Sequence, residues 1–128
     1  MASVVVDSSA WIEYLRNTTH PASHAVRTLL IRRRAASFPI IEMELLRGVK
    51  PAQKSSLGHL MAVVPSLPLD RDDFQMAGDM MNRLLSKGIT VPPLDGLIAS
   101  ACLRRDLEIL TLDRHFELVP GMKRHPLR

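Results

Sequence analysis

The sequence predicts an α/β fold in which a parallel sheet is covered by helices on both faces. Short β-rich runs alternate with segments of helical spacing, which is the pattern of strand–helix–strand units. With 128 residues, 46% of them hydrophobic, the chain fits one domain that can bury a real core. The single cysteine, Cys102, cannot form an internal disulfide, so the fold does not depend on an oxidising compartment. We expect one domain over residues 1–128, with a loose basic tail at 123–128.

Short segments with strand character recur along the chain. Residues 3–6 are a mostly β-branched run that ends at an acid, which is typical of a buried strand. Residues 35–38 form a weaker strand, and prolines confine the segment 66–69 to a sheet edge. Residues 108–112, with the pattern EILTL, form the last clear strand. Ligand sites in open parallel sheets lie beyond the carboxyl ends of the strands, so the chemistry is expected there.

The predicted helices have start and stop signals of the usual kinds. Ser8 or Ser9 can cap the first helix. Asp70 and Asp73 resemble a capping box for a long helix that Gly88 closes. The predicted helices cover residues 8–16, 20–34, 39–46, 51–61, 70–87 and 93–105.

Composition excludes several classes of protein. The amino terminus has only a three-residue apolar run before an acid, unlike a secretory signal. No apolar run approaches the roughly 20 residues of a membrane helix, so we expect a soluble, cytoplasmic protein without a membrane partner. One cysteine excludes a cysteine zinc cluster. The chain lacks the P-loop, the dinucleotide-binding glycine motif and the Gly-x-Ser-x-Gly elbow. No lysine follows a clear strand, which disfavours a phosphoacceptor signalling domain.

The net charge of +4 indicates an anionic partner such as nucleic acid. Thirteen of the 17 cations are arginines, whose planar guanidinium suits phosphate. The candidates for contacting a nucleic acid are Arg32, Arg33, Arg34, Arg47, Arg104, Arg105 and Arg114.

Four acids stand at places where a site is expected. Asp7 directly follows the first strand, and Asp113 directly follows the last. Asp95 lies in the first turn of the helix that begins at Pro93, and Glu44 lies on the helix after the weak strand. Each could serve alone as a cap or turn residue. Glu44 and Asp95, however, lie within apolar stretches, where carboxylates need a cation to offset desolvation. A hard divalent ion, Mg²⁺ or Mn²⁺, fits oxygen ligands.

Four segments, in this order and spacing, resemble a PIN domain of the VapC type, the toxins of bacterial toxin–antitoxin modules. They are VVVDSSAWIEYL, EMELLRG, PLDGLIASACL and ILTLDRHF. The resemblance implies a three-layer α/β/α sandwich with a central, mostly parallel sheet. It also implies a Mg²⁺-dependent endoribonuclease, in which Mn²⁺ can substitute, that forms a homodimer and is inhibited by a cognate VapB-type antitoxin.

The family's acid positions fall on residues of these segments. They are Asp7, Glu44, Asp95 and Asp113. Glu44 is chosen over Glu42 because the family's acid stands immediately before Leu-Leu-Arg-Gly. Our hypothesis is that the three aspartates bind Mg²⁺, directly or through water, and that Glu44 positions or deprotonates the attacking water.

Other residues at these motifs are expected to support the site. Ser8 and Thr111 match small hydroxyl positions of the family and could bind a metal-bound water or a phosphate, and Arg114 could contact the RNA. The sequence departs from the family two or three residues after the fourth acid. Many members carry an Asp or Asn there, and this chain has His115 and Phe116, which bears on how a second metal would be held. Turn histidines are more often structural or solvent-facing.

One alternative belongs to a different functional class. A PIN-like fold without turnover could act by binding RNA or a protein. Metal-dependent fragments of RNA, abolished by EDTA, would distinguish the nuclease from the binding module.

Overall fold

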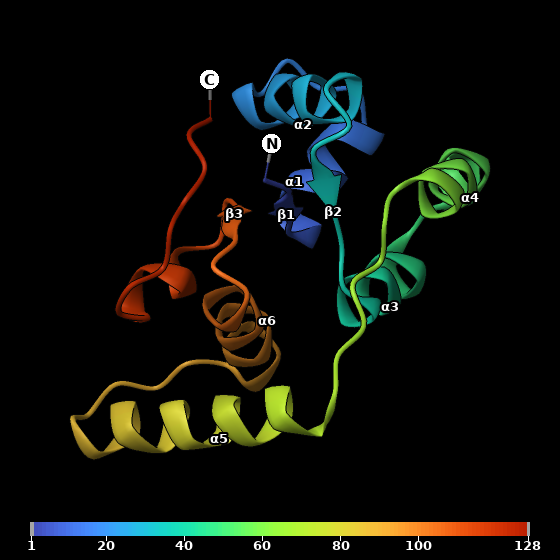
Figure 1. Cartoon of the computed structure of the whole chain (residues 1–128). Helices are drawn as coiled ribbons and strands as arrows, with labels where there is room; N and C mark the ends of the chain where they lie inside the picture. The colour runs from blue at the N-terminus through green and yellow to red at the C-terminus, as the bar shows by residue number, and fades with distance from the viewer. Residues whose placement is uncertain (1, 128) are drawn as a thin grey trace.

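A three-stranded parallel sheet lies at the centre of the structure, a computed structural model that describes residues 2–127 (Figure 1). The strand β1 (Val4–Val6) is central, with β2 (Ala35–Ala36) on one side and β3 (Glu108–Leu110) on the other. Val5 is paired with Ala36 and with Ile109. All three residues of β1 are completely buried, which explains their unbroken apolar run.

Helices cover both faces of this sheet. In Figure 1, α2 lies above the sheet, and α6 and then α5 lie below it. α1 packs against α2 and α3, while α5 packs against α6. The predicted three-layer α/β/α sandwich is therefore confirmed. The helices are α1 (Ser8–Leu15), α2 (Pro21–Ile31), α3 (Pro39–Gly48), α4 (Lys54–Val63), α5 (Arg71–Ser86) and α6 (Pro93–Arg104), with short 3₁₀ turns η1 (Pro51–Gln53) and η2 (Arg114–Leu118).

Two arginines at the end of α6 hold the start of α5. The capping box predicted for Asp70 and Asp73 is present, with the Asp73 backbone N–H donating to Asp70 Oδ1 at 3.1 Å. Arg105 donates to both carboxylate oxygens of the fully buried Asp73, at 2.6 and 2.9 Å. Arg104 donates to Asp70 at 2.7 Å, and the Arg105 guanidinium lies 5.4 Å from the centre of the Phe38 ring. We call these four charged residues the α5–α6 clamp.

Two segments beside the sheet differ from what the sequence pattern indicates. Residues 66–69 form a single parallel bridge, between Ser66 and Ser37, rather than a strand, because Pro65 and Pro68 have no N–H to donate. In the tail expected to be loose over 123–128, residues 123 and 125 are hydrogen-bonded to β3. Ile109 donates its N–H to the Lys123 carbonyl at 2.9 Å, and its own carbonyl accepts from the His125 N–H at 2.8 Å. The free edge of β3 supplies these partners.

Several helix ends differ from the prediction: the helix predicted over 39–46 extends to Gly48, and the one predicted over 51–61 is α4, which begins at Lys54 after η1 and ends at Val63. The helix predicted over 20–34 ends at Ile31, and Arg33 then adopts a positive φ of 54° before β2 begins. The residue that precedes α1 as its N-cap is Asp7, and its side chain makes no capping hydrogen bond. That carboxylate is therefore free for other partners. Over residues 2–127, the structure contains no helix with the length and apolarity required to cross a bilayer.

Candidate functional site

Asp7 lies at the carboxyl end of the central strand and is 97% buried. Its Oδ2 accepts hydrogen bonds from Thr111 Oγ1 at 2.8 Å and from Ser9 Oγ at 3.0 Å. Burial raises the pKa of Asp7, and these hydrogen bonds oppose that rise. The fold thus holds a desolvated carboxyl group with hydroxyl donors and no cationic side chain as a hydrogen-bond partner in the described residues.

Ser9, rather than Ser8, supports Asp7 with its side chain. Besides contacting Asp7, Ser9 Oγ accepts a hydrogen bond from the Leu112 N–H at 3.0 Å. Thr111 Oγ1 in turn accepts from the Asp113 N–H at 2.9 Å. The two hydroxyls therefore fix the loop after β3 against the start of α1. Within residues 2–127, the Ser8 side chain makes no hydrogen bond. The backbone N–H of Ser8 lowers the pKa of Asp7 by hydrogen bonding to its carboxylate.

Asp95 and Asp113 meet at the same edge through His115. The ring Nδ1 of His115 lies 2.8 Å from Asp95 Oδ2 and 2.9 Å from Asp113 Oδ1. Asp113 caps η2 by accepting the His115 backbone N–H at 2.9 Å. Burial raises the pKa of Asp95, and the neighbouring aspartates raise it further. The hydrogen bond with Asp95 raises the pKa of His115.

Glu44 approaches the aspartates from α3. Its Oε1 is buried and has no hydrogen-bond partner in the part of the chain that the structure describes. Burial raises the pKa of Glu44, and the charges of the three aspartates raise it further, while Arg47 opposes them. Glu42 instead accepts a hydrogen bond from the Ser66 hydroxyl. The structure thus places Glu44, and not Glu42, beside the other acids.

The structure distinguishes three of the seven arginine candidates. Arg104 and Arg105 belong to the α5–α6 clamp, so their charge is already neutralised by carboxylates. Arg114 is exposed at the start of η2, and its side chain makes no ion pair among residues 2–127. Near Glu44, Arg16 and Lys50 border a small cavity of about 60 Å³. Arg16 and Lys50 beside Glu44, and Arg114 beside Asp113, lie where a phosphate backbone could approach the acids.

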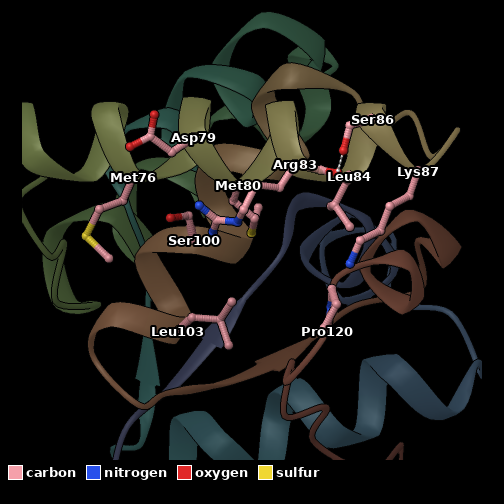
Figure 2. Close-up of a pocket in the computed structure, with 10 residues that line it drawn as sticks. All are labelled: Met76, Asp79, Met80, Arg83, Leu84, Ser86, Lys87, Ser100, Leu103 and Pro120. Atoms are coloured by element: carbon pink, nitrogen blue, oxygen red, sulfur yellow. Dashed lines mark hydrogen bonds between the residues drawn. The ribbon is translucent and has the colours of Figure 1, made fainter.

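A second, larger cavity lies away from the acids, beside α5 and α6. Figure 2 shows that Arg83 and Lys87 extend from α5 toward the cavity that Leu103 and Pro120 border below. Its volume is about 710 Å³. None of the four candidate acids lines it, so its size does not make it the catalytic site.

The fold and the acid cluster together define a class of protein. The PIN-domain family matches residues 4–122, and the chain belongs to that family.

Relatives with a stated activity are similar over most of the chain. Ribonuclease VapC11 of Mycobacterium tuberculosis and VapC ribonuclease Mb1587 of Mycobacterium bovis are each 33% identical to it over 121 residues. These alignments cover 91% of this chain and 90% of each relative. The resemblance to the VapC type is therefore confirmed.

Solved structures agree with this placement. The DNA-bound VapBC of Salmonella typhimurium has a TM-score of 0.81 with 25% identity and covers 100% of both chains. VapBC2 of Rickettsia felis, bound to a fragment of its promoter, has a TM-score of 0.78 with 15% identity and covers 95% of this chain and 96% of its own. The latter likeness concerns the fold alone.

Proposed function

We propose that the chain is the toxin of a type II toxin–antitoxin system and acts as a Mg²⁺-dependent endoribonuclease. The observation that carries this proposal is the gathering of four carboxylates from distant segments at one edge of the sheet. Three of them, Asp7, Glu44 and Asp95, have raised pKa values because they are buried and lie near one another. A protein that only binds RNA gains nothing from such mutual repulsion, whereas a divalent cation relieves it.

The donor atoms fit a hard divalent cation. Asp7, Asp95 and Asp113 offer carboxylate oxygens, the ligands that Mg²⁺ and Mn²⁺ prefer. The buried Glu44 oxygen has no partner among residues 2–127, and a bound water or a cation would satisfy it. When bound, the ion would polarise a phosphodiester oxygen and lower the pKa of its water.

The chain's own residues would orient this chemistry. Ser9 and Thr111 hold the Asp7 carboxylate in one direction, because both hydroxyls donate to the same oxygen. Glu44 would position the attacking water or accept its proton, since a raised pKa brings a carboxylate nearer to the range of a general base. Arg114 would contact a phosphate of the substrate. The fragments produced would carry a 5′-phosphate if the chemistry of the family holds.

The partners of this activity follow from the relatives. Two relatives are named ribonucleases, which supports an RNA substrate. Several similar structures are VapBC complexes, which supports a VapB-type antitoxin as the protein partner. We also propose a homodimer, which light scattering of the purified protein would test.

Cleavage of total RNA by the purified chain tests the activity. We expect discrete fragments in Mg²⁺ and none in EDTA. Asp7→Asn should lower the cleavage rate at least about 100-fold, because losing a metal ligand costs more than losing a group behind one. Asp79→Asn is the matched control, since Asp79 is exposed on α5, away from the cluster. Wild-type cleavage by Asp7→Asn would refute the assignment, and RNA binding without cleavage would favour the alternative binding module.

A further inference from the structure

His115 occupies a position between two of the candidate metal-binding acids. One possible ligand atom from each of His115, Asp95 and Asp113 lies within 4.8 Å of the other two. Nδ1 is 2.8 Å from the Asp95 oxygen and 2.9 Å from the Asp113 oxygen. The ring nitrogen is therefore in direct contact with both carboxylates.

These separations are those of hydrogen bonds, and they are also compatible with neighbouring ligands around an octahedral cation. With ligand atoms about 2.1 Å from the metal, adjacent ligands lie about 3 Å apart. Both separations from Nδ1, 2.8 and 2.9 Å, are within about 0.2 Å of this value. A cation at this point would replace the hydrogen bonds from Nδ1 with coordination by all three groups, with the ring proton on Nε2.

A fold-supporting role explains the ring position less well. The Asp113 oxygen that contacts the ring already accepts the His115 backbone N–H at 2.9 Å, so η2 is capped without the imidazole. The His115 side chain is 48% exposed, which leaves little packing to fix it.

We propose that His115 is a direct ligand of the divalent cation, and that with Asp95 and Asp113 it makes a site that prefers Mn²⁺ to Mg²⁺. This inference rests on the proposed function, because it concerns the ion of the same acid cluster. Imidazole nitrogen suits transition metals, whereas Mg²⁺ is bound almost entirely by oxygen. A neutral imidazole also adds a ligand without adding a fifth negative charge beside four carboxylates.

Binding of Mn²⁺ to the purified, RNA-free protein tests this inference. Electron paramagnetic resonance measures free Mn²⁺ during a titration, competition with Mg²⁺ gives the second affinity, and pulsed spectra detect ¹⁴N coupled to the bound ion. We expect ¹⁴N coupling in the wild type and none in His115→Ala. The variant should bind Mn²⁺ at least about tenfold more weakly, with a smaller change for Mg²⁺. His115→Asp should keep Mg²⁺ binding but lose the preference for Mn²⁺.

His59→Gln is the matched control, because His59 is an exposed histidine on α4; it should retain both the coupling and the affinities. Circular dichroism confirms that each variant is folded. Absence of ¹⁴N coupling in the wild type, or its persistence in His115→Ala, overturns the inference. If Mn²⁺ binds and Asp7→Asn weakens it, that outcome leaves the proposed acid site standing. If Mn²⁺ binding is absent or insensitive to Asp7→Asn, the acid site fails as well.

Discussion

Substitution Asp73→Ala tests how much the α5–α6 clamp stabilises the fold. The Asp73 side chain is fully buried and forms two hydrogen bonds with Arg105, and Arg104 lies 3.3 Å from it. Removing one partner of a buried ion pair costs about 3–5 kcal/mol, since the other charge is left without compensation. Arg105 is 24% exposed, so water can reach it, and we expect the lower end, about 3 kcal/mol. For 128 residues this corresponds to a fall in Tm of about 12 °C.

Urea unfolding at pH 7 measures this cost directly. The matched control is Glu117→Ala, which breaks the exposed Glu117–Arg124 pair of 2.7 Å and should cost less than about 1 kcal/mol. RNA cleavage well below the variant's Tm should change less than about threefold, because the clamp lies at the opposite end of α6 from Asp95. A loss below about 1 kcal/mol for Asp73→Ala would refute the reasoning.

The pH dependence of the stability difference between wild type and Asp73→Ala gives an independent check. The Arg105 guanidinium holds the pKa of Asp73 well below its ordinary value of 3.8. A lowered folded-state pKa contributes stability that is fully present above the unfolded pKa and is lost as pH falls through the folded one. The stability difference between wild type and Asp73→Ala should therefore be constant from pH 7 to about pH 5 and shrink below about pH 4. A difference that grows on acidification would contradict the ion-pair account.

Three further predictions concern the packing and chemistry near the site. Gly96→Ala should destabilise the fold by about 1–3 kcal/mol in thermal unfolding, because its new Cβ would lie 2.3 Å from Met81 Sδ. Adding Met81→Ala should restore part of the loss. If the destabilisation of the double variant were the sum of the two single ones, the clash would be refuted. Ser9→Ala should slow RNA cleavage at least about tenfold, since it removes a hydrogen bond to the Asp7 carboxylate. Ser8→Ala should change the cleavage rate less than twofold. Equal rates for the two variants would refute the different roles of the two serines. Burial raises the pKa of the Cys102 thiol to about 12, so a thiol reagent at pH 8 should react only after denaturation, and rapid labelling of the native protein would contradict this.

The edge at which the acids meet was predictable from sequence because of strand direction. Asp7 and Asp113 follow parallel strands, and the carboxyl ends of parallel strands lie at one edge of the sheet. The capping box at Asp70 and Asp73 was predictable because its signal is local, three residues apart.

Interactions between distant segments were not predictable in this way. From the local sequence, Ser8 and Ser9 are equally able to support Asp7. Only the position of the loop after β3, whose Leu112 N–H donates to Ser9 Oγ, distinguishes Ser9. His115 follows a turn, where a ring can point to solvent or to a neighbouring carboxylate. The pairing of residues 123–125 with Ile109 depends on a sheet edge left free by the strand order. Arg104 and Arg105 looked available for RNA because their acidic partners lie more than 30 residues earlier.

The hydrogen bond between Thr111 and Asp7 joins residues 104 positions apart. During synthesis, β1 emerges long before β3, and contacts of such high separation form late because the loop between them must first close. A partial chain that ends before β3 contains Asp7, Glu44 and Asp95 but lacks Thr111, Asp113 and His115. The acid cluster therefore cannot assemble on the ribosome until almost the whole sequence described has been made. Under the proposed function, such a partial chain would lack Asp113 and would not cleave RNA until the sheet has closed.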